Sequence, residues 1–259
     1  MARTTGPPGI SVASKLFAIL DCFDAQSPSL TLSEIASATG LPLSTVHRLL
    51  GELTEWGALE RLPNGAYRVG MRLWEVGVLA SRQRNLREAA SPYMQDLYDA
   101  AKQNVQLAVI DGLQALCLER IYGKRAVSTE TDVGGRMPLH ATATGKSLLA
   151  FSPLEFVHEV LEAGLERYTR HTLVDVGRLM DELEEIRDTG VAYSHGERSL
   201  GVVAVASPIL GKRCRLLGSV GIVAPVGTRT GRLGPAVRTA ALTISRLLGA
   251  GLQGRPPGP

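Results

Sequence analysis

The chain has 259 residues, of which 44% are hydrophobic and 20% charged, and its formal net charge is +3. This is the composition of an ordinary soluble globular protein with one large domain or two unequal ones. No apolar run reaches the roughly 18 residues that a membrane-spanning helix needs, and residues 1–10 lack the apolar core of a secretory signal, so we expect a cytoplasmic protein. The three cysteines are odd in number and far apart, which is typical of neither a disulfide framework nor a zinc site.

The first predicted elements are two helices. Apolar residues recur at helical spacing from Val12 to Phe23, which predicts an amphipathic helix of about three turns. After a loop, Thr31-Leu32-Ser33-Glu34 is a capping box, in which the threonine hydroxyl and the glutamate carboxylate each accept from a backbone N–H of the other residue. The short helix that follows is expected to end at Gly40, because glycine adopts the left-handed conformation that other residues resist.

A third helix is predicted over Leu43–Glu55, with an apolar face formed by Val46, Leu49, Leu50 and Leu53. Together with the helix before it and the glycine turn between them, it has the sequence form of a helix-turn-helix. Two ordinary core helices would give the same pattern. This segment alone therefore does not decide between DNA binding and plain packing.

A hairpin pattern directly after the third helix favours DNA binding. Leu59–Leu62 and Ala66–Val69 alternate as strands and flank Pro63-Asn64-Gly65. Asn-Gly between two strands is a strong hairpin signal, because both residues tolerate a positive φ. A small hairpin in this position is a wing. Residues 1–75 hold six Lys/Arg and seven Asp/Glu, so the order of elements, and not the charge, supports this interpretation.

The polar side of the third helix is the predicted DNA-reading surface, because the N-terminal turns of such a helix meet the base edges. Arg48 has the geometry to fork onto a guanine or to hold a phosphate. For His47, base contact and an ordinary solvent-facing position both remain open. The predicted DNA-binding residues are Ser33, Ser44, Thr45, His47, Arg48, Arg61, Asn64 and Arg68.

Behind the wing, a helix over 73–90 is expected to link the winged helix-turn-helix domain, residues 10–72, to a second domain over residues 91–252. Ser91-Pro92 is expected to cap a new helix at the start of that domain. The strands predicted next cover 105–110, 113–121, 191–193, 201–209 and 216–224, and the helices cover 141–150, 154–161, 175–188 and 234–248. Strands that arrive as hairpins with helices between them predict an α+β domain on a mostly antiparallel sheet.

Motifs for catalysis are incomplete in this second domain. Gly145-Lys146-Ser147 resembles the end of a phosphate-binding loop, but that motif needs a glycine where His140 stands. The serines lack the glycine pattern of a nucleophile elbow. The five histidines have no metal-binding spacing. We therefore expect no enzyme, no metal and no cofactor.

The arrangement of the chain resembles the IclR family of bacterial regulators over nearly its whole length, and three stretches carry the resemblance. Residues 10–72 look like the winged helix-turn-helix of that family. Met137–Lys146 is similar to its Pro-Leu-His-x-(Thr/Ser)-Ala-x-Gly-Lys segment, and Gly190–Glu197, followed by Gly201–Ile209, is similar to its Gly-Tyr-Ala-x-Asp-x-Glu-Glu…Gly…Ala-x-Pro signature. The resemblance implies a GAF-like effector-binding domain, a homodimer or homotetramer, and control of a nearby catabolic or transport operon.

The resemblance also implies an effector pocket between the sheet and the Pro-Leu-His loop. Family members that bind very small acids place an Asp, a Cys and two Ser around the ligand, and this chain has Ser194, Ala204, Gly221 and Val223 at those positions. A glyoxylate-sized carboxylate would then be buried unpaired, at a cost on the order of several kcal/mol. We therefore expect a larger and more apolar effector, such as an aromatic or branched acid.

The head group of such an acid is expected on the loop amides where a helix begins, a position that favours anions. Glu197 matches the second Glu of the signature and is expected to brace the loop in preference to touching the ligand. For His195, a position in the pocket and a position on the surface both remain open. The predicted effector-binding residues are Leu139, Thr142, Ala143, Thr144, Gly145, Ser194, Ala204, Gly221 and Val223.

The predicted function is that of a sequence-specific regulator which binds a double-stranded DNA operator under the control of a small organic effector. Repression is commoner than activation in the family, although these residues do not decide between a repressor and an activator. Two rival interpretations are an enzyme built on the C-terminal domain, which would need a converging acid–base or nucleophile pair, and a module whose wing contacts another protein.

Overall fold

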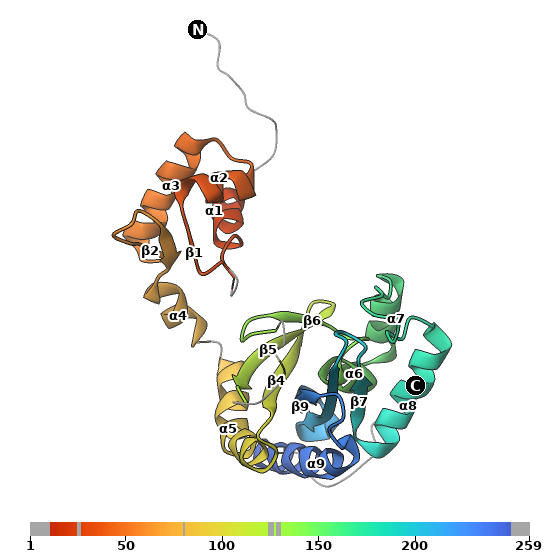
Figure 1. The fold of residues 1–259 in the computed structure, drawn as a ribbon. Helices are drawn as coiled ribbons and strands as arrows, with labels where there is room; N and C mark the ends of the chain where they lie inside the picture. The colour runs from red at the N-terminus through yellow and green to blue at the C-terminus, as the bar shows by residue number, and fades with distance from the viewer. Residues whose placement is uncertain (1–10, 25–26, 80, 124–126, 128–130, 250–259) are drawn as a thin grey trace. The chain divides into compact units, whose positions relative to one another are not determined.

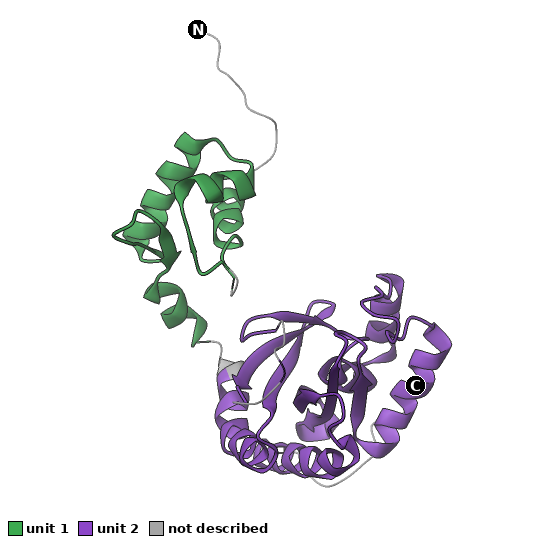
Figure 2. Ribbon diagram, viewed as in Figure 1, with its two compact units in different colours: residues 1–81 green, residues 82–259 purple. Residues whose placement is uncertain are grey.

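The computed structural model describes residues 11–24, 27–79, 81–123, 127 and 131–249. It divides into two compact units, residues 1–81 and residues 82–259. Figure 2 shows the two units in different colours.

The first unit contains the predicted helices and hairpin, in the predicted order. Its elements are α1 (Val12–Leu20), β1 (Ser29–Leu30), α2 (Leu32–Thr39), α3 (Leu43–Trp56), β2 (Leu59–Arg61), β3 (Tyr67–Val69) and α4 (Met71–Gly77). The strands form a three-stranded antiparallel sheet in the order β1-β3-β2. The two-residue strand β1 was not predicted, because its pairing with β3 joins segments far apart in the sequence.

Local sequence signals explain where the helices of the first unit begin and end. Both bonds of the capping box are present, with the Glu34 N–H on the Thr31 hydroxyl and the Thr31 N–H on the Glu34 carboxylate. Gly40 ends α2 at a φ of 66°. Ile35 of α2 and Val46 of α3 are both fully buried in one cluster, so the two helices pack directly against each other. These features confirm the helix-turn-helix.

The segment between the units differs from the prediction of one helix over 73–90 and a new helix at Ser91-Pro92. The structure has α4, then α5 over Ser81–Ala101, with Pro92 inside α5. An interior proline costs roughly 3 kcal/mol. The apolar face of α5 nevertheless continues through it, because Leu86, Ala90, Met94 and Leu97 are all buried at helical spacing. Burial of that face offsets the free-energy cost of the interior proline.

The second unit is built on one six-stranded sheet in the order β6-β5-β4-β9-β8-β7, with every neighbouring pair antiparallel. The strands are β4 (Asn104–Asp111), β5 (Gln114–Ile121), β6 (Arg136–Pro138), β7 (Ala192–His195), β8 (Val202–Leu210) and β9 (Leu216–Pro225). Five of them were predicted within a few residues. The sixth, β6, is a three-residue edge strand that ends in a proline, and such a segment carries little strand signal.

Helices cover both faces of this sheet (Figure 1). One cluster of buried residues joins the sheet to α5 and α9 (Thr230–Leu247), and a second joins it to α6 (Ala143–Ala150), α7 (Leu154–Glu162) and α8 (Val176–Thr189). This is the α+β architecture predicted from the sequence. It places the N-terminus of α6 beside the inner strands, which positions the site described next.

Three further findings hold for the described residues. None of their helices is long and apolar enough to cross a membrane. Within the same part of the chain, no group of three or more His, Cys, Asp or Glu side chains is arranged to hold a metal ion. Cys22, Cys117 and Cys214 are present as thiols and are not joined in disulfides.

Candidate functional site

Helix α3 presents its polar side to solvent. Ser44, His47 and Arg48 are exposed and Thr45 is half-buried, while Val46 between them is fully buried. The 3.6-residue helical period separates these two sets, so packing of the apolar face fixes the polar face outward. The predicted exposure of this side is confirmed.

The wing presents a second group of polar side chains. Arg61, Asn64 and Arg68 are exposed. Gly65 takes a φ of 84° at the tip, and the Ala66 N–H donates to Asn64 Oδ1 at 3.1 Å. Asn64 therefore shapes the turn with its carbonyl oxygen, a role that the sequence analysis did not assign to it.

Several cations of this unit already have acidic partners. Arg48 pairs with Glu52 one helical turn later, and Arg68 bonds Glu60 on the neighbouring strand at 2.7 and 2.9 Å. Both pairs are about half exposed, and exposed pairs of this kind contribute only about 0–1 kcal/mol. Exchange of these carboxylates for a phosphate or a guanine therefore costs little. The remaining predicted residue, Ser33, is exposed in the first turn of α2.

A cavity in the second unit opens between the N-terminus of α6 and the inner strands. It is lined by Gln106, Thr131, Met137, Ala141, Thr142, Ala143, Ser194, Glu197, Arg198, Ser199, Val202, Ala204 and Val223. Its volume is about 60 Å³. At about 10–15 Å³ for each water by this measure, it holds roughly four to six waters, which suits a single-ring or short branched acid.

Five of the nine predicted effector residues line this cavity: Thr142, Ala143, Ser194, Ala204 and Val223. The other four do not line it. Leu139 belongs to the core beneath α6, and Thr144 is buried with its hydroxyl near Gln106 Nε2 at 3.3 Å. A Cβ atom on Gly145 would lie 2.5 Å from the Leu139 carbonyl oxygen, and one on Gly221 would lie 3.1 Å from Thr144 Cγ2. These two glycines thus serve close packing behind the wall.

Several residues that line the cavity were not predicted from the sequence. Gln106 is a buried polar residue inside an apolar strand, and that contrast was a usable signal. Arg198 follows the Gly190–Glu197 signature directly, and its guanidinium lies 4.1 Å from the centre of the Tyr168 ring. His195 is exposed, with its ring stacked on that of Tyr193. Of the two positions considered for His195, in the pocket or on the surface, the structure therefore shows the surface position.

The start of α6 offers a hydrogen-bond donor to the cavity. Thr142 caps the helix, with its hydroxyl oxygen accepting from the Gly145 N–H at 3.1 Å. The N–H group of Ala143, which lines the cavity, makes no hydrogen bond within the described part of the chain. Free amides at a helix N-terminus attract anions.

A buried charge network lies behind this wall. Lys146 is completely buried and donates both to Glu182 of α8 and to Glu197, the latter at 2.9 Å. Glu197 also accepts from the His195 N–H at 3.3 Å. Glu197 therefore braces the loop, as the sequence analysis expected, and it lines the cavity as well.

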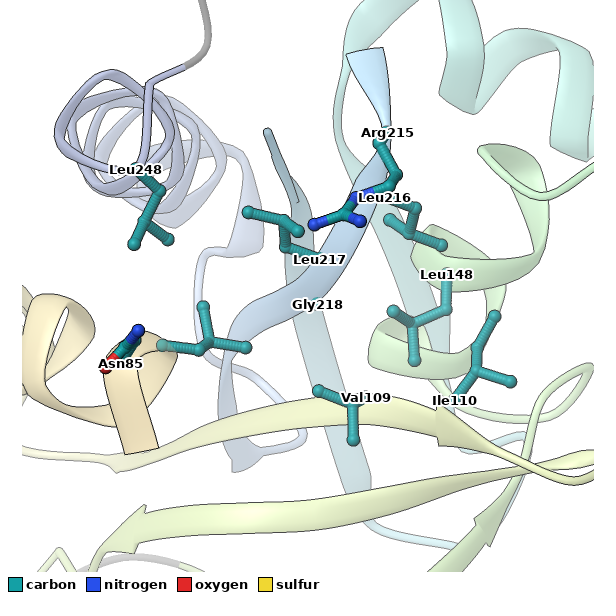
Figure 3. Close-up of a pocket in the computed structure, with 10 residues that line it drawn as sticks. Asn85, Val109, Ile110, Leu148, Arg215, Leu216, Leu217, Gly218 and Leu248 are labelled. Atoms are coloured by element: carbon teal, nitrogen blue, oxygen red, sulfur yellow. The ribbon is translucent and has the colours of Figure 1, made fainter. Parts of the chain in front are cut away.

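A larger cavity of about 380 Å³ lies elsewhere in the second unit and shares no lining residue with the first. Figure 3 shows Arg215 and Asn85 among leucine and valine side chains. Both polar residues are exposed, and none of the predicted effector residues lines this space. We therefore take the smaller cavity at α6 as the candidate ligand site.

Two family models match the chain. The model of the C-terminal part of the bacterial transcriptional regulator IclR matches residues 78–246, and the model of the IclR helix-turn-helix domain matches residues 12–63. Among curated proteins, the HTH-type transcriptional regulator KipR of Bacillus subtilis is 33% identical over 240 residues, covering 91% of this chain and 96% of KipR. The acetate operon repressor of Salmonella typhimurium is 30% identical, covering 96% of this chain and 94% of that protein.

A solved structure is similar over most of its length. It is an IclR homologue from Microbacterium hydrocarbonoxydans in complex with 4-hydroxybenzoate, with a TM-score of 0.87 and 31% identity, covering 92% of this chain and 99% of that one. With these matches, the predicted fold class of a winged helix-turn-helix followed by an α+β effector-binding domain is confirmed.

Proposed function

The chain belongs to the IclR family of transcriptional regulators, and from that membership we propose that it acts in the cytoplasm and represses an operon until a small aromatic or branched acid binds its second domain. The observation that carries the effector part is the cavity at α6, whose wall combines apolar side chains with the Ala143 amide donor and Arg198. The 4-hydroxybenzoate complex of the Microbacterium homologue supports an aromatic acid, and the similarity to the acetate operon repressor of Salmonella supports repression.

We assign DNA reading to α3 and the wing. Thr45, His47 and Arg48 would contact base edges, and Arg61 and Arg68 would hold phosphates and set the register. The support is that Arg48 and Arg68 are more than half exposed and that their ion pairs are weak enough to exchange. Ser33, Ser44 and Asn64 would add contacts to the backbone of the duplex.

We assign homodimer formation to α4, since an operator with two half-sites needs two wings. None of the residues of α4 is buried within the described chain. Its two large apolar side chains, Met71 and Trp74, are 60% and 61% exposed. Two large apolar side chains exposed together on one helix support an interface with a second copy of the chain. Light scattering tests this assignment. A dimer or a tetramer that Trp74→Glu converts to a monomer supports it, and an unchanged oligomer contradicts it.

In the effector site, the carboxylate of the acid would rest on the Ala143 amide at the N-terminus of α6, with Arg198 as the neighbouring cation. The apolar body would contact Ala204 and Val223. Effector binding changes DNA affinity only if the acid prefers one arrangement of the dimer over another, because equal affinity for both shifts nothing.

The experiment is a fluorescence-anisotropy titration of the full-length protein on DNA from the flank of its own gene, with and without a panel of aromatic, branched and very small acids. We expect one aromatic or branched acid to release the DNA, and affinity to fall steeply with salt because bound cations displace counterions. DNA binding that no acid alters would refute effector control. Release by glyoxylate or pyruvate alone would refute the apolar effector.

A further inference from the structure

Glu197 lines the effector cavity, and one of its two carboxylate oxygens has no hydrogen-bond donor among the described residues. Its Oε1 accepts from Lys146 Nζ at 2.9 Å and from the His195 N–H at 3.3 Å. Its Oε2 is buried and has no partner in the same part of the chain. A buried carboxylate oxygen without a donor costs free energy, and native structures rarely leave one.

The side chain is held in this position from two sides. The Thr172 hydroxyl donates to the Glu197 carbonyl oxygen at 2.7 Å, and the Thr169 hydroxyl donates to that of Gly196 at 2.6 Å. These bonds fix the backbone, and Lys146 fixes Oε1. Lys146 is also shared with Glu182, so two carboxylates compete for one ammonium and Oε2 does not gain it.

We propose that Glu197 Oε2 accepts a hydrogen bond from a hydroxyl group of the effector, so that the cognate ligand is a hydroxylated acid. This rests on the proposed function of the same cavity. Two groups of the wall have opposite preferences: the unpaired Ala143 amide at the start of α6 favours an anion, and Glu197 Oε2 favours a hydrogen-bond donor. A hydroxy acid meets both. An ammonium donor is disfavoured because Arg198 already contributes positive charge to the same wall.

The test uses isothermal titration of the full-length protein with benzoate, 3- and 4-hydroxybenzoate, and the methyl ethers of the two hydroxy acids. Each ether keeps the oxygen but removes the donor. We expect one hydroxy acid to bind roughly ten- to a hundred-fold more tightly than both benzoate and its own ether, the range expected for a hydrogen bond to a charged acceptor.

Glu197→Gln then isolates the oxygen concerned. The glutamine carbonyl stays on Lys146 and the His195 N–H, because both are donors, and its NH₂ group takes the place of Oε2. The preference for hydroxyl over ether should fall at least ten-fold, since the ether oxygen can now accept. The penalty for the larger methoxy group cancels, because it is present in both proteins.

Glu184→Gln is the matched control. It makes the same chemical change at an exposed carboxylate on α8 that neither lines the cavity nor pairs with Lys146, so it should keep the wild-type preference. If benzoate binds the wild type as tightly as the hydroxy acids do, the inference about Glu197 fails while effector binding stands. If neither benzoate nor any of its derivatives binds, the proposed aromatic effector fails with it. The ligand series on the wild type decides the question even if Glu197→Gln does not fold.

Discussion

Replacement of Lys146 by methionine removes the ammonium that Glu182 and Glu197 share in the buried network. Methionine has a similar length and is apolar, so the void it leaves is small. Two carboxylates then remain without this cation. Glu197 is 10% exposed in its side chain and Glu182 is 29% exposed, so Glu182 can regain water and Glu197 cannot. The loss at Glu197 therefore dominates the effect.

The size of the effect follows from that difference in burial. Breaking a buried ion pair from one side costs about 3–5 kcal/mol, and the partial exposure of Glu182 places Lys146→Met at the lower end, about 3 kcal/mol. For a domain of about 150–250 residues each kcal/mol lowers Tm by roughly 2–4 °C. We expect the second unit to melt about 6–12 °C lower than in the wild type.

Two probes separate the units in the assay. The chain has two tryptophans, Trp56 and Trp74, and both lie in the first unit. Tryptophan fluorescence therefore follows the first unit, while far-UV circular dichroism follows both. Lys146→Met should lower the circular dichroism transition and leave the fluorescence transition in place.

Lys102→Met is the control, because Lys102 also pairs with an acid, Asp99, but both side chains are more than half exposed. It should change stability by less than about 1 kcal/mol. If Lys146→Met melts like the wild type, or if both variants lower Tm equally, the network does not stabilise the domain and the reasoning is wrong.

Three further predictions concern local structure. Gly65→Ala should destabilise the first unit by about 1–2 kcal/mol, because Gly65 has a φ of 84°. Gly51→Ala, with equally open space around the new Cβ, should stabilise the first unit by up to about 1 kcal/mol, because Gly51 lies in helix α3 and alanine favours a helix. Urea unfolding followed by fluorescence compares the two variants, and equal effects would contradict the backbone argument. Hydrogen bonds from Thr31 lower the pKa of Glu34 below its ordinary 4.5, so the stability it contributes is present above pH 4.5 and is lost as the pH falls through the lowered pKa. Glu34→Gln should flatten that acid limb of the stability curve, and an unchanged limb would exclude Glu34 as its source. Burial raises the pKa of the Cys117 thiol to about 11. Iodoacetamide at pH 8 should therefore leave this thiol unmodified until urea unfolds the second unit, which mass spectrometry of the peptides measures. Rapid labelling of Cys117 in the folded protein would contradict this.

Much of the fold could be predicted because its signals are local. The capping box at Thr31 and the Asn-Gly turn at 64–65 each fix the backbone through bonds between near neighbours. The strands of the hairpin also pair with near neighbours in the sequence, across that turn. The error at Pro92 arose because a local signal, the serine–proline start of a helix, was weighed without the long-range burial of Leu86 and Met94.

The candidate effector site could be predicted only in part, for a related reason. Motif alignment located Ser194 and Ala204 at the cavity, but it does not tell which side chains of an aligned segment face the ligand. Leu139 and Gly145 stand in the right segment and pack inward. Lys146 stood out in the sequence through two local motifs, the incomplete phosphate loop and the Met137–Lys146 segment. Its partner Glu182 is 36 residues away, and only the folded chain reveals that pairing.

The most direct measurement for the central claim, that α3 reads DNA, is the operator affinity of Arg48→Ala beside that of Arg84→Ala. Both arginines are exposed and both pair with a glutamate four residues later on a helix, but only Arg48 lies on α3. Loss of a base contact should weaken operator binding by Arg48→Ala by about 1–3 kcal/mol, or roughly 5- to 150-fold in Kd. The operator affinity of Arg84→Ala should equal that of the wild type. A folded Arg48→Ala protein that binds its operator like the wild type would contradict the account.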